Sequence, residues 1–454
     1  MVFEPPPVEP PSLEPADQPP PDPNRHPIRV VVTDDLHRWR LTVGFRLLLS
    51  IPLWIWLFIW SIGVFFAAIV NWFLTLIKGR SPLSLHDFFA SYIRFTTHLH
   101  AYFFFAADPY PSFTGKPGYP IDVVIDPPER QNRWKTLFRI VLVIPAAMIA
   151  GTLVGAPGGG GNNSSYDDQS SNSWEYGIAF ASGFFLISVL AWFACLARGR
   201  APHGMRDLFA YGLRYSAQTW GYFFLLTDRY PNSDPAEPAA DTPEEPRPVR
   251  LEVDDDLRRS RLTVFFRGLL YLPQLVWLIL WGIAAAVALI VSWFATLAMG
   301  RTPSALHRFL AAYVQYIVHV TAYVTIVANP FPGFVGTPGT YPVEVEIDGP
   351  ERQHRLKTLF RLFLAFPAFV IEATLTGVLF FVAIFGWFVG LFLGRMPLGL
   401  RNLGAYAIRY AAETNAYLFL LTDVYPYSGP WDFAPPRPAL PPHELEPEPE
   451  IAFT

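Results

Sequence analysis

Long apolar runs alternate with short polar segments along this chain. The run from Ile51 to Ile77 contains no charged residue, and comparable runs follow Arg139, Arg267 and Arg361. About 18 consecutive apolar residues are enough to suggest a helix that crosses a membrane. The pattern therefore predicts a mainly α-helical, polytopic membrane protein whose constant partner is the lipid bilayer.

The apolar runs recur in a fixed register. The string Phe-Arg, five residues and Pro begins at Phe45, Phe138, Phe266 and Phe360. Each copy is followed by Trp-Phe, five residues and Gly-Arg, and later by a closing DPYP, DRYP, NPFP or DVYP. The first and third copies share RLTV, whereas the second and fourth share PERQ and KTLFR. We therefore predict four repeats arranged as two duplicated halves.

The registers and the composition together predict the domain boundaries. The two ends and the central linker are rich in proline and acidic residues, a composition that does not support a packed core. In order, we expect a disordered tail at 1–26, membrane repeats at 27–111 and 112–232, a linker at 233–247, membrane repeats at 248–332 and 333–428, and a disordered tail at 429–454.

Each repeat is expected to contain a short β-strand, a helical hairpin and an amphipathic helix. From Phe-Arg to Gly-Arg there are about 34 residues, roughly 50 Å as one helix, which exceeds a hydrocarbon core of about 30 Å. Either one long tilted helix or a hairpin of two spans would fit. The polar insertion 155–177 in the second repeat must reach water, which favours the hairpin. The other repeats would then turn near 61–63, 282 and 376–377.

A hairpin places both arginine marks of a repeat on one face of the membrane. The inserted loop contains no Lys or Arg, so the positive-inside rule assigns the arginine face and both termini to the cytoplasm of a multi-pass cell (inner or plasma) membrane protein. Gly-Arg-x-Pro predicts a helix stop. The expected interfacial anchors are Arg46, Arg80, Arg139, Arg200, Arg267, Arg301, Arg361 and Arg395.

The third segment of each repeat has polar residues at spacings of seven and four, which places them on one helical face. This polar stripe is the candidate functional site: Asp87, Arg94, His98, Asp207, Arg214, Gln218, Arg308, Gln315, His319, Asn402, Arg409 and Glu413. The helix could lie in the membrane plane or form a third span. Four strands in one sheet would need an even number of crossings per repeat, hence eight spans; twelve spans with inverted units is the alternative.

The chain shows little chemistry of its own. There is no Walker loop, GxSxG, HExxH or dinucleotide-binding turn, so we expect no enzyme and no cofactor. His98 and His100 lack a third ligand, and we predict no metal site. We also expect no nucleic-acid partner. The repeated Asp-x-Tyr-Pro predicts a turn, and its Asp108, Asp228 and Asp423 are candidates for pairing with neighbouring arginines.

The repeated motifs resemble those of the uncharacterised bacterial membrane family known as domain of unknown function 4389 (DUF4389). The resemblance covers residues 27–111, 120–232, 248–332 and 342–428, and departs from the pattern at Gln315, at Asn329 and in the insertion. It implies a multi-pass bacterial membrane protein and brings no known activity. We therefore expect a non-enzymatic membrane scaffold that recruits cytoplasmic proteins through its proline-rich tails. The alternative is a transporter or channel with a path lined by the polar stripe.

Overall fold

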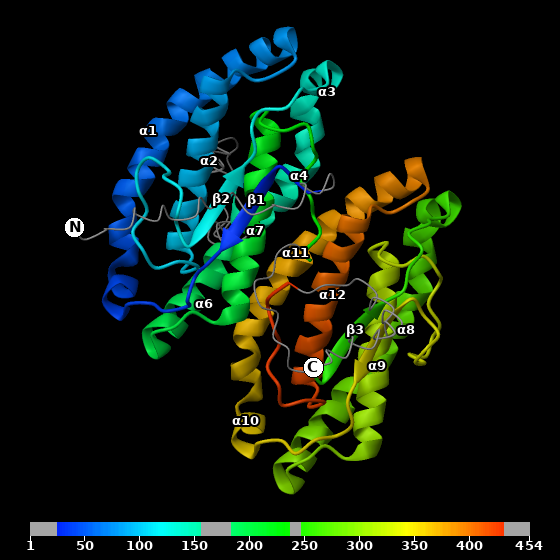
Figure 1. The fold of residues 1–454 in the computed structure, drawn as a ribbon. Helices are drawn as coiled ribbons and strands as arrows, with labels where there is room; N and C mark the ends of the chain where they lie inside the picture. Colours follow the sequence, from blue (N-terminus) through cyan, green and yellow to red (C-terminus); the bar gives the residue numbers. More distant parts are fainter. Residues whose placement is uncertain (1–24, 156–182, 237–246, 431–454) are drawn as a thin grey trace, which may run out of the picture.

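The computed structural model of the protein describes residues 25–155, 183–236 and 247–430. Residues 25–236 are called the first half below, and residues 247–430 the second half. Most of the predicted tails and linker, and nearly all of the predicted loop 155–177, lie outside the described residues. The described chain is mainly helical, and short strands lie where the alternating segments predict them (Figure 1).

The strands form two separate two-stranded sheets. Strand β1 (Ile28–Val32) pairs antiparallel with β2 (Ile121–Ile125), and β3 (Val249–Val253) pairs antiparallel with β4 (Val343–Ile347). The alternating pattern correctly predicted half-buried strands. The four strands do not join in one sheet, so the argument for an even number of crossings loses its premise.

The predicted helical hairpin is wrong in three of the four repeats. The run forms one continuous helix in α1 (Arg40–Lys78), α8 (Arg261–Met299) and α11 (Arg361–Leu393). Glycine costs only about 1 kcal/mol inside a helix, so Gly63, Gly282 and Gly377 do not end it. In an apolar setting a turn would instead expose backbone groups that the continuous helix satisfies internally.

The second repeat differs because of its insertion. Its run is divided into α4 (Arg139–Val154) and α6 (Gly183–Arg198), with α3 (Arg133–Leu137) preceding α4, as α10 (Arg355–Leu359) precedes α11. The undivided helices α1, α8 and α11 are long and apolar enough to cross a membrane. The insertion therefore does not report a turn that the other repeats share.

The helix stops predicted from Gly-Arg-x-Pro are confirmed. Gly79, Gly199, Gly300 and Gly394 have φ values of 68–73°, the left-handed conformation that glycine adopts without a Cβ clash. After each stop a second helix begins behind a proline. These helices are α2 (Leu83–Phe103), α7 (His203–Phe223), α9 (Ser304–Val324) and α12 (Leu398–Leu418).

The second helices form a middle layer between the long helices and the sheets (Figure 1). On α2, Tyr92 packs on Trp60 of α1, whereas Arg94 bonds the carbonyl of Val123 in β2. Two residues along a helix are about 200° apart, so α1 and the sheet lie on opposite faces of α2. A second helix enclosed in this way is neither an isolated interfacial helix nor a lipid-facing third span.

The two repeats within each half are antiparallel to each other. The N–H of Arg38, before α1, donates to the carbonyl of Gly199, after α6, at 2.9 Å. Reciprocally, the N–H of Gln131 donates to the carbonyl of Gly79 at 2.8 Å. Within each half, the start of one repeat's run thus lies beside the end of the other repeat's run. The two arginine marks of one repeat are therefore at opposite ends of its apolar run, not side by side as the predicted hairpin would place them.

Candidate functional site

In the first and third repeats the polar stripe fastens a strand to its helix. On α2, His98 Nε2 lies 2.9 Å from Asp122 Oδ1, and Arg94 Nε lies 3.6 Å from the same oxygen. On α9, His319 Nε2 lies 3.5 Å from Glu344, and Gln315 donates to the same carboxylate. The stripe therefore holds β2 and β4 against the middle layer.

The carboxyl group of Asp122 shows how this attachment is balanced. Burial by itself would raise its pKa, but hydrogen bonds from His98 and from the N–H groups of Gly118 and Val123 lower it overall. The carboxylate is therefore kept ionised by groups from α2 and from the loop before β2. This arrangement is an internal attachment between the strand and its helix.

In the second and fourth repeats the stripe joins the two halves of the molecule. Asp207 of α7 accepts a hydrogen bond from the Tyr427 hydroxyl at 2.9 Å, and the amide of Asn402 in α12 donates to Asp234 at 2.8 Å. In each half, the segment that follows the last helix therefore packs on the last helix of the other half. The residues after α12 contact α7, and the residues after α7 contact α12. The arrangement is reciprocal, since Gly204 packs against Ser428 while Gly399 packs against Ser233.

The remaining stripe residues of these repeats bond the same segments. Arg409 donates to the carbonyl of Gly429 at 2.6 Å and to Glu413 at 2.9 Å, and Arg214 donates to the carbonyl of Asp234. Gln218 donates to the carbonyl of Ile28 in β1 at 2.9 Å. These buried side chains satisfy backbone groups at the junction.

Two members of the predicted stripe lie apart from the rest. The side chain of Asp87 is 78% exposed, and Arg308 is also exposed. Both precede the central part of their helices. Across the described residues, the stripe is thus divided among a sheet attachment, a junction between halves and the outer surface, without convergence on one cavity.

The arginine of Phe-Arg is the most regular feature of the interior. Arg46 donates to the carbonyls of Tyr102 and Ala107 at 3.0 and 3.1 Å, and to Asp108 at 2.5 Å. Its guanidinium also lies 4.4 Å from the centre of the Tyr102 ring. These acceptors belong to the carboxyl end of α2 and to the turn that follows it, where carbonyls lack helical partners and a cation is favourable. We call this arrangement the arginine clamp.

The clamp recurs at each equivalent arginine. Each of these guanidinium groups stacks over the tyrosine near the end of the second helix and bonds the closing Asp or Asn of its repeat: Arg139 with Tyr222 and Asp228, Arg267 with Tyr323 and Asn329, and Arg361 with Tyr417 and Asp423. The expected pairing of Asp108, Asp228 and Asp423 with arginines is confirmed. All four arginines are at most 3% exposed, so their prediction as interfacial anchors is wrong.

Each second helix is followed by an unusual turn that the sequence analysis missed. Phe105, Leu225, Ile326 and Leu420 adopt φ values of 62–64°, a conformation costly for residues with a Cβ. Arg38 and Arg259 bond the carbonyls of Phe105 and Ile326, while Gln131 and Gln353 bond those of Leu225 and Leu420. A sequence signal for these contacts was present, because Gln131 and Gln353 belong to the PERQ string that the second and fourth repeats share and the first and third lack.

The arginines of Gly-Arg have a different location. Arg80, Arg200, Arg301 and Arg395 are exposed at the far ends of the long helices. Arg200 forms an isolated β-bridge with His37, and Arg301 and Arg395 form such bridges with Arg352 and Arg258. These four residues remain candidates for an interfacial position.

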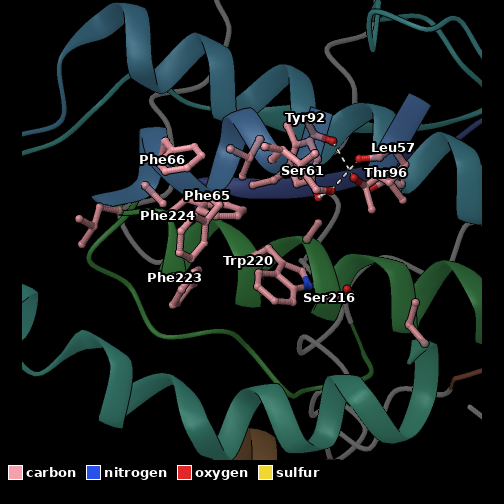
Figure 2. Close-up of a pocket in the computed structure, with 18 of the residues that line it drawn as sticks. Leu57, Ser61, Phe65, Phe66, Tyr92, Thr96, Ser216, Trp220, Phe223 and Phe224 are labelled. Carbon is pink, nitrogen blue, oxygen red and sulfur yellow. Dashed lines mark hydrogen bonds between the residues drawn. The ribbon is translucent and has the colours of Figure 1, made fainter. Parts of the chain in front are cut away.

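A groove of about 1130 Å³ lies between α1, α2 and α7 in the first half. Figure 2 shows its apolar part, with Phe65, Phe66, Phe223 and Phe224, next to a small hydroxyl group cluster. In that cluster Ser61 Oγ lies 2.8 Å from the Tyr92 hydroxyl, and Thr96 donates to the Tyr92 carbonyl. Trp54 and Trp72 both line the groove, about 27 Å apart along α1. Its size and lining suit a hydrocarbon chain.

A histidine side chain lines this groove from α2. Burial lowers the pKa of His100 to about 4, and its Nδ1 lies 2.8 Å from the carbonyl of Thr96. The imidazole is therefore neutral at physiological pH. Within the described residues, no three His, Cys, Asp or Glu side chains are grouped closely enough to hold a metal ion.

Three stretches of this chain match one family model. The family is DUF4389, a domain of unknown function. The DUF4389 matches cover residues 40–115, 261–335 and 355–429, beginning where α1, α8 and α10 begin. Each DUF4389 match therefore contains a long helix, a second helix and an arginine clamp. No curated protein and no solved structure matches the chain.

Proposed function

We propose that this protein is a non-enzymatic scaffold of the bacterial cell membrane, built from four DUF4389 units in two duplicated halves. The observation that carries the proposal is the large apolar surface that the long helices form on one side of the molecule. The long helices expose bulky apolar side chains along their whole length, such as Leu41 at 71% and Ile77 at 69%. A patch of this extent marks a surface that contacts lipid or another protein.

The arginine clamp of the second repeat supports counting that repeat as a DUF4389 unit beside the three matched stretches. Arg139 of the second repeat bonds Asp228 and stacks on Tyr222 as its three counterparts do, although its long helix is divided. The interior polar groups support a structural role. They bond strands, turns and the opposite half, and the described stripe residues do not surround a transport path.

Partner recruitment is the second part of the proposal. Both described chain ends lie on the sheet side of the molecule. His26 bonds Ile28 at the start of β1, and Gly429 bonds Arg409 at the junction. The proline-rich tails that continue from these ends would then reach the same aqueous compartment, which we propose to be the cytoplasm, and bind proteins there.

Fractionation and co-purification test this function. The full chain should stay with membranes after alkaline carbonate extraction, and so should a variant lacking residues 1–24 and 431–454. The shortened variant should lose the proteins that co-purify with the full chain. Release of the full chain by carbonate, or an unchanged set of co-purified proteins, would contradict the proposal.

The groove favours a second candidate function, the binding of a lipid hydrocarbon chain. Ser216 lines the groove and is half-buried, so Ser216→Trp should fill part of it. We expect this variant to lose most of the phospholipid that the purified protein retains, as measured by native mass spectrometry. Ile55→Trp is the matched control, because Ile55 is exposed on α1 and does not line the groove. Equal lipid retention by both variants would refute this function.

A further inference from the structure

The apolar surface of the long helices is too long for an ordinary membrane crossing. Exposed apolar side chains on α1 extend from Leu41 to Ile77, about 54 Å of helix. A hydrocarbon core of about 30 Å would cover this length only at a tilt of roughly 56°, whereas helix tilts reach about 40°. The same problem arises for α8, where exposed apolar side chains extend from Leu262 to Met299.

The position of the sheets makes a crossing still less favourable. Trp60, near the middle of α1, packs on Tyr92, and two residues further along α2 Arg94 bonds β2. A crossing α1 would therefore carry the β1–β2 sheet to the level of the bilayer centre. Each strand of a two-stranded sheet has one unpaired edge, and unpaired backbone groups are not tolerated in lipid. The outer ion pair of Arg29 with Asp126 would be placed there as well.

The second half has the same arrangement. Trp281 of α8 packs on Tyr313 of α9, and the outer side of the β3–β4 sheet carries Arg250 paired with Glu346 and Asp348. These three side chains are 42–53% exposed. Both halves thus have an apolar helical side and, across the middle layer, a charged sheet side.

We propose that the protein lies flat in a single leaflet, with its long helices parallel to the membrane plane and its sheets in water. The surface formed by α1, α4, α6, α8 and α11 then contacts acyl chains. A helix with its side chains is about 10–12 Å across, and one leaflet contributes about 15 Å of hydrocarbon. One layer of helices therefore fits within one leaflet, as in-plane helices do.

This inference rests on the membrane association in the proposed function and adds the orientation. It predicts that positions along one exposed line of α1 lie at equal depth. A crossing helix would instead place the middle of that line deepest. The single cysteine, Cys195, is buried, so a Cys195→Ala background allows one engineered cysteine at a time.

The test uses nitroxide labels on single cysteines in the full chain, reconstituted in phosphatidylcholine–phosphatidylglycerol vesicles. The labelled positions share one exposed side of α1 or the equivalent side of α8: Leu41, Leu48, Ile59, Val70, Leu262, Leu269, Leu280 and Val291. Val31 of β1, which is also exposed, is the aqueous reference. Collisions with oxygen and with a water-soluble nickel chelate report the depth of each label.

The flat orientation predicts the same oxygen-favoured ratio at all helix positions and a chelate-favoured ratio at Val31. A profile with a maximum at Ile59 and Leu280, and water-exposed ends, would overturn the flat orientation while leaving the membrane scaffold intact. Access of the chelate to every helix position would overturn both. These outcomes separate failure of the orientation from failure of the proposed function.

Discussion

The two halves of the molecule differ most where they face outward and least where they bond their own backbone. Both halves keep the arginine clamp, the left-handed turn and the two-stranded sheet. The long run of the second repeat is divided between Val154 and Gly183, whereas α11 continues unbroken. Buried backbone groups must be satisfied in every copy, but an apolar outer surface tolerates a break provided that the exposed ends reach water.

The groove between α1, α2 and α7 is another outward-facing feature in which the two halves differ. Ser61 and Thr96 place hydroxyl groups beside Tyr92 in the first half, and the equivalent positions in the second half are Gly282 and Ile317 beside Tyr313. The hydroxyl groups of Ser61 and Thr96 therefore have no equivalent at these two positions of the second half. This difference supports a separate role for the first-half groove in lipid binding.

The largest expected effect compares two clamps with different acceptors. Arg46→Met leaves the partly buried Asp108 carboxylate without its ion-pair partner, while Arg267→Met leaves the neutral amide of Asn329. We expect the first variant to lose about 3 kcal/mol of stability and the second about half as much, because an unpaired buried charge costs more than an unpaired amide. Thermal unfolding in detergent measures both, with the exposed Arg80→Met as control. Equal losses would show that the carboxylate is not what distinguishes the halves.

The next effect concerns the contacts of α11 with α6 and with α4. A Cβ on Gly183 would lie 2.0 Å from Thr374 Cγ2, whereas a Cβ on Gly377 would lie 3.1 Å from Thr152 Cγ2. Gly183→Ala should therefore cost about 2 kcal/mol by overpacking, and Gly377→Ala less than about 1 kcal/mol. Thr374→Ala should partly restore the stability of Gly183→Ala in a double variant. Gly151→Ala, which meets no neighbour within 4 Å, should be neutral.

A pH dependence should distinguish the halves at the start of β1 and β3. Burial, followed by the positive charges of Arg214 and Arg229, lowers the pKa of His26 to about 4. Between pH 6.5 and 4 the unfolded chain binds a proton that the folded chain does not, so stability falls as the pH decreases through this window. We expect about 2 kcal/mol less stability at pH 5 than at pH 7 from this group.

The equivalent position in the second half is Arg247, a residue type that does not titrate in this range. His26→Gln should therefore remove this part of the pH dependence and leave the rest. Urea unfolding in detergent at several pH values measures the difference between the two proteins. An identical pH dependence in both would contradict the assignment to His26.

The smallest effect is expected at the outer sides of the sheets. Arg29→Ala removes the partly exposed ion pair with Asp126, and Arg250→Ala removes the exposed ion pairs with Glu346 and Asp348. Each substitution should cost less than about 1 kcal/mol. The cost should decrease further in 1 M salt because exposed charges are screened. A large effect of Arg250→Ala on membrane binding, without loss of stability, would indicate that the sheet side meets the membrane and would oppose the flat orientation.

Much of the fold could be predicted from sequence because its signals are local. The alternating segments marked all four strands, the spacing of seven and four marked the second helices, and Gly-Arg-x-Pro marked the helix ends. The clamp was predicted only in part. The closing Asp residues were expected to meet arginines, but the arginines themselves were assigned to a membrane interface.

The errors arose where one local observation was extended to the other repeats. The polar insertion in the second repeat suggested a hairpin everywhere, yet α1, α8 and α11 continue through the corresponding positions. Arg46 and its equivalents resemble anchors because they flank apolar runs. Their burial depends on the carboxyl end of a helix that follows about 56 residues later, as the contact of Arg46 with Tyr102 shows.

The amino-acid order alone determined the strands, the second helices and the ends of the long helices, because the period of apolar positions and the chemistry of Gly, Pro and Asp act over a few residues. Only the tertiary structure decided which ends of the long helices meet, which arginines are buried and which face of the middle layer carries the sheets. Those features depend on satisfying backbone groups across contacts that are distant in sequence. The resulting division into an apolar side and a charged side is the basis for the orientation proposed in the membrane.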